Sequence, residues 1–284
     1  AYQHLRDALS RADRWAEAAS VCEAAAADRG AAFDADARID WTFTAAEIWR
    51  RRLGRRDRAR ELCRAVLAER PGHLGALNAL TVVAAAEGDF EEVARLLERK
   101  LDLFEHTPAA AALLGELAQL YTERLGRPQA ARALYERLLR LQPDHRVALR
   151  HVATDCLACG DGAGALRAYR RLLALGPDPA TTLEAGRAEQ RSLHWSLAQL
   201  GRETPGAVDV EVELRAVLAA SPGDREALAA LDELYTAQGD SGRLLEVVRQ
   251  RLATAVDLAD ASALGLRLAA LLAASGPGRV AEAA

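Results

Sequence analysis

The chain has 284 residues, half of them apolar, which is enough to bury a sizeable core. Its formal net charge of −4 and pI of about 5.9 exclude a surface tuned throughout to nucleic-acid phosphates or anionic lipid. No run of apolar residues approaches the roughly 18 that a membrane-spanning helix needs. We therefore expect a protein without a membrane span.

The chain opens with "AYQHLRDALS", an amphipathic helical pattern, and contains no methionine. We interpret it as a processed product or a piece of a longer chain. The four cysteines are too few and too irregularly spaced for a disulfide framework. This favours a reducing compartment, and we expect a cytoplasmic protein.

Apolar residues recur at helical spacing along the chain, as in Leu134, Leu138 and Leu141, whereas the alternation typical of strands is nearly absent. Short turns, such as Gly-Asp and Leu-Gly-Arg, separate helices of about fifteen residues. A threonine followed by proline, as at Thr204-Pro205, predicts some of the helix starts. The pattern predicts an all-α fold.

The helices repeat in pairs. The segment "RLGRRDRARELCRAVLAERPGHLGAL", which starts at Arg52, aligns without a gap on "RLGRPQAARALYERLLRLQPDHRVAL", which starts at Arg124. The same register places Gly88-Asp89 on Gly160-Asp161, and a third copy brings Gly239-Asp240 to that turn. Such self-similarity predicts a stack of helical hairpins, none of which could bury its apolar faces alone.

The first copy contains an arginine run, "WRRRLGRRDRAR", with seven arginines. In the second copy Pro128 and Ala130 replace Arg56 and Arg58, so the repeat itself does not require the charge. We favour a solvated turn whose arginines pair with neighbours such as Asp57. A local contact with RNA or DNA through the Arg50–Arg60 cluster is the alternative, although few aromatic residues accompany it.

The repeat resembles the tetratricopeptide repeat (TPR), best in "RVALRHVATDCLACGDGAGALRAYRRLLALGPD" from Arg146 to Asp178. There Ala153 and Ala165 stand at the family's small-residue positions, Tyr169 at its aromatic position and Pro177 at its closing proline. Asp232 departs from the pattern, because it replaces the small residue of a first helix. The resemblance implies an α-solenoid, a right-handed superhelix of about seven helix-turn-helix repeats. We expect one solenoid over residues 1–284, with the best-defined repeats at 40–256.

Candidate chemical sites are weak. Cys156 and Cys159 form a CxxC motif without a second motif or a histidine pair at zinc spacing, so we expect them to pack beside a turn. His73 and His145 fall at equivalent places in two copies, and repetition explains them without ligation. We expect no catalytic residue, cofactor or metal, and hence no enzyme within this chain.

The resemblance implies that first helices line a concave, partner-binding surface. The register of the Arg146 unit, transferred to its neighbours, assigns to this surface Arg51, Asn78, Val82, Glu116, Arg150, Thr154, Trp195 and Gln199, and also Trp41 and Ile48. We expect a non-catalytic scaffold that binds a peptide or protein and takes part in a larger complex, and we favour such a partner over a nucleic acid. The alternatives are RNA or DNA binding through the Arg50–Arg60 cluster and a role as the regulatory repeat arm of a larger enzyme.

Overall fold

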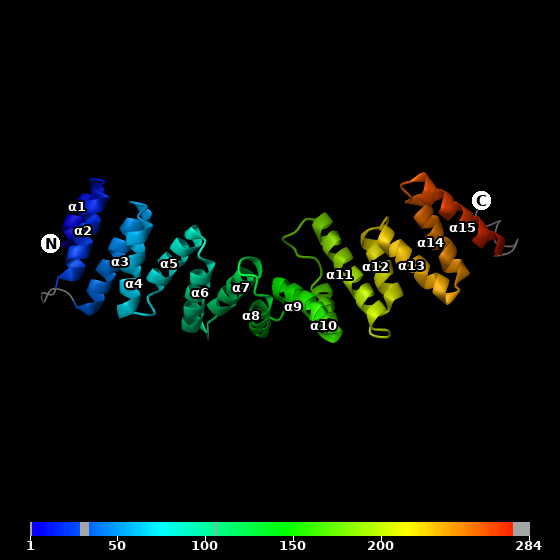
Figure 1. Cartoon of the computed structure of the whole chain (residues 1–284), viewed down its shortest axis with the longest axis horizontal. Helices are drawn as coiled ribbons and strands as arrows, with labels where there is room; N and C mark the ends of the chain where they lie inside the picture. The colour runs from blue at the N-terminus through cyan, green and yellow to red at the C-terminus, as the bar shows by residue number, and fades with distance from the viewer. Residues whose placement is uncertain (1, 29–33, 106, 275–284) are drawn as a thin grey trace. The chain divides into compact units, whose positions relative to one another are not determined.

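The computed structural model describes residues 2–28, 34–105 and 107–274. These residues form fifteen α-helices and no strand (Figure 1), in agreement with the predicted all-α helical-repeat fold. No helix among them is both long and apolar enough to cross a membrane. The chain divides into two compact units, Ala1–Pro143 and Asp144–Ala284, which we describe separately.

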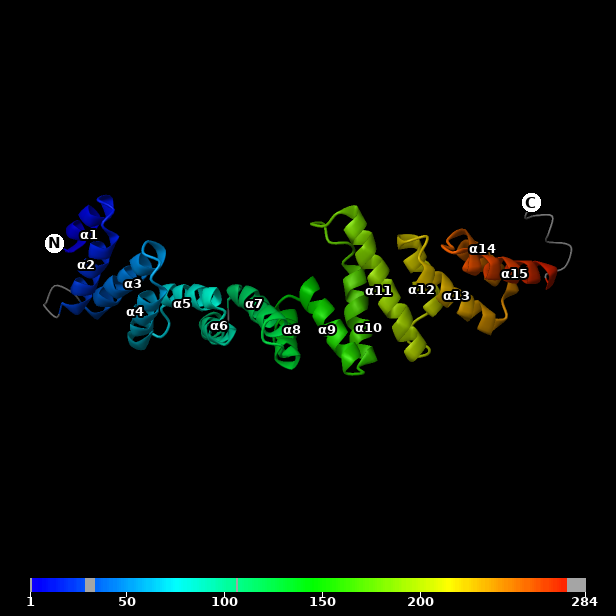
Figure 2. The ribbon, with the colours of Figure 1, turned by 45° about the horizontal axis from the view of Figure 1, so that its top comes forward.

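Each unit is a succession of antiparallel helix pairs, visible from two directions in Figures 1 and 2. Unit 1 contains α1 (Tyr2–Arg11), α2 (Trp15–Ala27), α3 (Ala35–Arg51), α4 (Arg56–Glu69), α5 (Leu74–Glu87), α6 (Phe90–Phe104), α7 (Ala109–Glu123) and α8 (Pro128–Leu141). Unit 2 contains α9 (Arg146–Ala158), α10 (Gly162–Ala174), α11 (Leu183–Glu203), α12 (Val210–Ala220), α13 (Arg225–Gln238), α14 (Ser241–Ala253) and α15 (Leu258–Ala274). The odd-numbered helices α1 to α13 are the first helices of the pairs, the even-numbered helices are the second, and α15 follows the last pair.

The repeated Gly-Asp turn has a defined backbone role. Gly88 and Gly239 end first helices with positive φ angles of 76° and 70°, a conformation that costs glycine little because it has no Cβ. The following aspartates, Asp89 and Asp240, then accept the backbone N–H three residues ahead and so cap the second helix. One dipeptide thus ends one helix and starts the next.

First helices are capped by a different device. The imidazole Nδ1 of His73 accepts the N–H of Ala76 at 3.1 Å, and His145 does the same at the equivalent place in its own copy. In the third copy Asp224 stands there, and its carboxylate accepts the N–H of Ala227 at 3.0 Å. Capping therefore explains the repeated histidines, which sequence reasoning attributed to repetition alone.

The prediction of a helix start at Thr204-Pro205 is wrong. α11 continues to Glu203, and the Thr204 hydroxyl donates to the carbonyl of Leu200 at the end of that helix. α12 starts later, where the Asp209 carboxylate accepts backbone N–H groups of the first turn. A carboxylate acceptor caps a helix, whereas this threonine hydroxyl already serves the preceding one.

The core lies between the paired helices. Ala131 and Ala165 are buried at the small-residue positions, and Tyr135 and Tyr169 are buried at the aromatic ones, as the repeat pattern predicts. The helices of the α9–α10 pair lie close together at Gly164, where an added Cβ would lie 2.8 Å from the Cys156 sulfur. Small side chains therefore set the spacing of the pair.

Asp232 shows what replaces a small residue where the pattern fails. It is only 2% exposed, and its carboxylate binds Arg251 of α14 and Arg267 of α15. The Arg267 Nη2 lies 2.6 Å from Asp232 Oδ1. Thr236 also donates to Oδ1, at 3.3 Å. An ionic cluster thus joins three helices at a site where the α9–α10 pair has Ala153.

Candidate protein-interaction face

Helices of the same kind lie next to each other within each unit. First helices meet through the contact of Phe43 on α3 with His73 at the start of α5, and through the Arg150–Glu189 ion pair between α9 and α11. Second helices are bridged by ion pairs near the start of the later helix: Arg58–Glu23, Arg127–Glu91 and Arg243–Glu211. The solvent-exposed side of the first helices of one unit is called its first-helix face below.

In unit 1, this face is least polar on α5. Leu74, Asn78 and Val82 are exposed at successive helical turns, and Val82 is 54% exposed. α5 has no charged residue before Glu87, its last residue. Glu116 is exposed on α7, the next first helix. The result is an uncharged strip with one amide, a composition suited to burial against a partner.

Three other residues assigned to the surface of unit 1 are arranged differently. Arg51 ends α3, is exposed and forms an ion pair with Glu47 one turn earlier. Ile48 is buried in the cluster that α3 forms with α2, so the inward register fails for this residue. Trp41 belongs to the same cluster, but one side of it lines a cavity.

In unit 2, Arg150 and Thr154 are exposed on α9, but neither is a free group. The Arg150 guanidinium lies 2.5 Å from a carboxylate oxygen of Glu189, which is itself 15% exposed. The Thr154 hydroxyl donates to the backbone carbonyl of Arg150. Arg150 therefore joins two first helices, a role that the sequence does not reveal.

Trp195 and Gln199 on α11 are half-buried. The Trp195 ring packs against a core cluster of unit 2, which includes Ala198, Leu214 and Leu228. On the same side of the helix, Ser192 is exposed and Ser196 is half-buried. Because α11 has 21 residues, longer than its neighbours, a register carried over from α9 does not fix which side of this helix is exposed.

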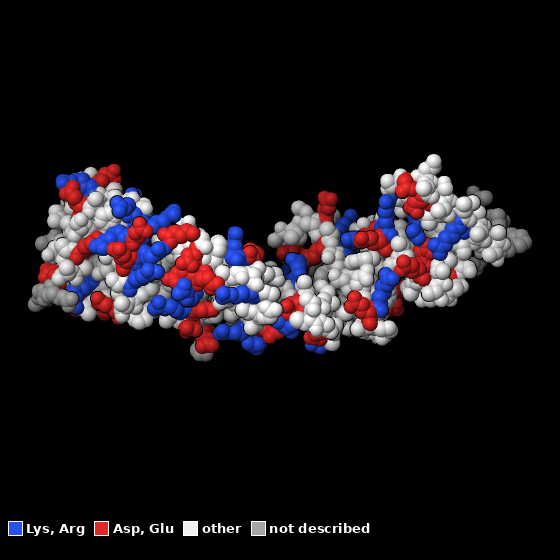
Figure 3. All heavy atoms as spheres, viewed as in Figure 1, with Lys and Arg blue, Asp and Glu red and all other residues white. Residues whose placement is uncertain are grey.

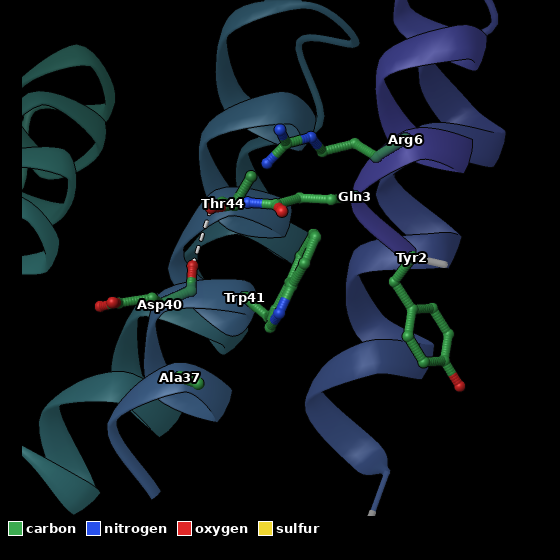
Figure 4. A pocket seen from close by; sticks show the side chains of 7 residues that line it. All are labelled: Tyr2, Gln3, Arg6, Ala37, Asp40, Trp41 and Thr44. Atoms are coloured by element: carbon green, nitrogen blue, oxygen red, sulfur yellow. Dashed lines mark hydrogen bonds between the residues drawn. The ribbon is translucent and has the colours of Figure 1, made fainter. Parts of the chain in front are cut away.

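A cavity of about 390 Å³ lies between the first helices α1 and α3 (Figure 4). Its walls comprise Tyr2, Gln3, Arg6, Ala37, Asp40, Trp41 and Thr44. Sequence reasoning missed this site, because α1 carries no recognisable repeat motif. The signal that could have found it is the inward register of Trp41 together with the polar residues spaced along the opening helix.

The arginine run is largely neutralised within unit 1. Five of its seven arginines have partners: Arg50 and Arg51 bind Glu47, Arg58 binds Glu23 and Glu61, Arg60 binds Glu87, and Arg52 stacks on Trp15 at 4.4 Å. Arg55 and Arg56 make no such contact within the described residues. Figure 3 shows acidic and basic atoms side by side over α3 to α6 rather than a basic field. This arrangement favours the solvated, paired interpretation of the run.

The cysteines are arranged as packing residues. Cys156 is buried and its sulfur lies 3.6 Å from an Asp161 carboxylate oxygen, whereas Cys159 is exposed. Burial raises the pKa of both Cys22 and Cys63 to about 11, so these thiols stay protonated and are poor nucleophiles. Within the described ranges no three His, Cys, Asp or Glu side chains form a group that could hold a metal ion.

These features define a helical-hairpin repeat protein with exposed first-helix faces. The family model described as "Tetratricopeptide repeat" matches residues 113–147 and 227–262, which span the α7–α8 and α13–α14 pairs. These two segments are tetratricopeptide repeats, as the sequence predicts.

Among curated proteins, 101 residues are 35% identical to a Pseudomonas aeruginosa protein named "Probable biofilm formation methyltransferase WspC". The match covers 31% of this chain and 23% of that protein, so the chain spans less than a quarter of the relative's length. Two solved structures are similar at low identity. MamA is 15% identical with a TM-score of 0.44, covering 60% of this chain and 91% of that chain. YrrB, described as a TPR protein with an unusual peptide-binding site, is 13% identical with a TM-score of 0.42, covering 67% and 90%.

Proposed function

We propose that this chain is a non-catalytic scaffold that binds a peptide or partner protein on its first-helix faces, the concave side of a tetratricopeptide solenoid over residues 1–284. The observation that carries the proposal is the uncharged strip on α5, where Leu74 and Val82 are exposed on either side of Asn78. Exposed apolar side chains flanking an amide are suited to an apolar segment whose backbone needs hydrogen-bond partners. The proposed surface also includes Arg51, Glu116, Arg150, Thr154, Trp195 and Gln199.

The charge distribution supports a protein partner over a nucleic acid. Most of the arginines that could contact phosphate are paired with carboxylates of the same unit, as at Arg58 and Arg60. A phosphate backbone would have to displace those carboxylates, and neighbouring acidic groups would repel it. We also place the protein in the cytoplasm, because its four cysteines are free thiols.

A second candidate function is that of a repeat arm in a larger enzyme or assembly. It is favoured by the match to WspC, a protein that carries the name of a methyltransferase and of which this chain covers 23%. In that case the partner-binding faces described above would serve the activity of a longer polypeptide, and the repeats themselves would remain non-catalytic.

The test compares equivalent substitutions on the two sides of the repeats. Val82→Glu and Thr154→Glu place a charge on the first-helix faces, whereas Val212→Glu does so on the second helix α12, where Val212 is 58% exposed. All three sites are exposed, so folding measured by circular dichroism should be unchanged. Arg150 and Trp195 are left unchanged in this test, because the first pairs with Glu189 and the second packs against a core cluster.

Each variant is used as bait for affinity capture from a native lysate, with and without nuclease. We expect a protein that is retained by wild type and by Val212→Glu but lost with Val82→Glu, regardless of nuclease. The loss should be about tenfold or more, because burying an unpaired charge in an interface costs well over 1 kcal/mol. Capture that survives both first-helix substitutions refutes the proposed face, and capture that disappears with nuclease supports a nucleic-acid partner instead.

A further inference from the structure

The cavity between α1 and α3 differs chemically from the α5 strip, because it presents one cationic group beside an aromatic ring. Figure 4 shows Gln3 and Arg6 extending from α1 toward α3, above the Trp41 indole. The Arg6 guanidinium carbon lies 5.3 Å from the centre of that ring. The Asp40 carboxylate points away from α1, so the charge directed into the space between these helices is that of Arg6.

Arg6 keeps donor capacity for a ligand. Its Nε and Nη2 donate to one oxygen of Asp7, at 3.0 and 2.6 Å, whereas its Nη1 donates no hydrogen bond within the described residues. The side chain is 27% exposed, so an incoming group can reach it while the Asp7 carboxylate and the Trp41 ring hold its orientation. The exposed Gln3 amide lies one helical turn before Arg6 and can supply a second donor.

We propose that this cavity binds an acidic side chain of a partner peptide, with an adjacent apolar residue of the peptide against Trp41. A carboxylate would accept from Arg6 Nη1 and the Gln3 amide, because a guanidinium can serve two carboxylates through its separate N–H groups. The apolar neighbour would cover the accessible part of the indole. The inference rests on the proposed function, since α1 and α3 are both first helices, and it adds the chemistry of the bound segment.

The test uses the whole chain labelled with nitrogen-15 and short peptides as probes. Acetyl-Leu-Glu-Leu-amide is titrated and compared with acetyl-Leu-Gln-Leu-amide, which has nearly the same shape but no charge. We expect the glutamate peptide to shift the Arg6 Nε–H and Trp41 indole N–H signals and to bind about fivefold more tightly, as suits a partly exposed ion pair.

Two variants and one control locate the effect. Arg6→Gln should remove the preference for glutamate, and Gln3→Glu should weaken glutamate-peptide binding by placing a competing carboxylate beside Arg6. Gln3 is exposed, so the second variant tests the site even if Arg6→Gln were to unfold α1. Arg14→Gln is the matched control, because Arg14 is also held by a nearby carboxylate, that of Glu17, but lies outside the cavity.

Equal binding of the two peptides, or unshifted Arg6 and Trp41 signals at millimolar peptide, would overturn the inference. So would tighter binding of acetyl-Leu-Gln-Leu with a free terminal carboxylate than of the glutamate peptide. The proposed function fails separately, by partner capture that is indifferent to both Val82→Glu and Thr154→Glu. The two outcomes are distinguishable because neither Val82 nor Thr154 lines this cavity.

Discussion

Substitutions in the ionic cluster around Asp232 can separate two contributions to the free energy of unfolding: the loss caused by a buried unpaired carboxylate and the gain from its cationic partners. We consider the double variant Arg251→Ala/Arg267→Ala, which removes both cations from Asp232, a carboxylate that is only 2% exposed in the wild-type fold. Removing the partners of a buried charge costs about 3–5 kcal/mol. The arginine side chains are 26% and 39% exposed, so solvent already screens part of the attraction, and we expect a loss of about 3 kcal/mol.

The triple variant that also carries Asp232→Ala is the informative comparison. It removes the stranded carboxylate and restores the small residue that the repeat pattern favours, as at Ala153. We expect it to lose about 1 kcal/mol, because replacing a whole buried ionic cluster with apolar groups is often close to neutral. The triple variant should therefore be more stable than the double variant by about 2 kcal/mol.

Urea denaturation followed by circular dichroism gives the free energies of unfolding, and amide hydrogen exchange locates the loss. Exchange is needed because stacked repeats can open locally. We expect faster exchange in α13, α14 and α15, with α9 and α10 little affected. A double variant as stable as the triple one would refute the reasoning, since Asp232 would then be no worse unpaired than absent.

Two further predictions concern helix caps. His73→Ala should lower stability by about 1 kcal/mol through loss of the cap on α5, whereas His73→Asp should retain it, because Asp224 caps the equivalent helix; urea denaturation of both variants checks this. Burial raises the pKa of Asp224, but hydrogen bonds from Arg191 and from the backbone outweigh it and hold the pKa below its ordinary value of 3.8. The stability that this carboxylate contributes is therefore complete above pH 3.8 and is lost as the pH falls toward the folded-state pKa. Urea denaturation at several pH values from about 2.5 to about 6 should show that wild type is more stable than Arg191→Gln and that this difference in the free energy of unfolding shrinks at the acid end. A difference that stays constant over this range would contradict the prediction.

The features that could be predicted from sequence are those encoded locally or repeated. The Gly88-Asp89 turn and its equivalents, the small residue Ala165 and the buried Tyr169 follow from periodicity and from the backbone needs of a turn. These needs involve residues within one helix pair, so a single aligned segment contains the necessary information.

What could not be predicted depends on which side chains meet across the stack. The Arg150–Glu189 bridge joins two residues that are 39 positions apart in the sequence. The exposed side of α11 depends on the packing of Trp195 against α12 and α13. Asp232 stood out as a departure from the pattern, but its partners on α14 and α15 lie 19 and 35 residues later. Such pairings follow from the three-dimensional register and carry no repeated signature.

The bridges between second helices also bear on the mechanics of each unit. Adjacent repeats are spanned by Arg58–Glu23, Arg127–Glu91 and Arg243–Glu211, in which the arginine side chains are 43%, 52% and 48% exposed. Salt screens these pairs far more strongly than it alters core packing. Ionic strength should therefore set how readily one hairpin tilts against the next, so that the bending stiffness of a unit is adjustable while its fold is not.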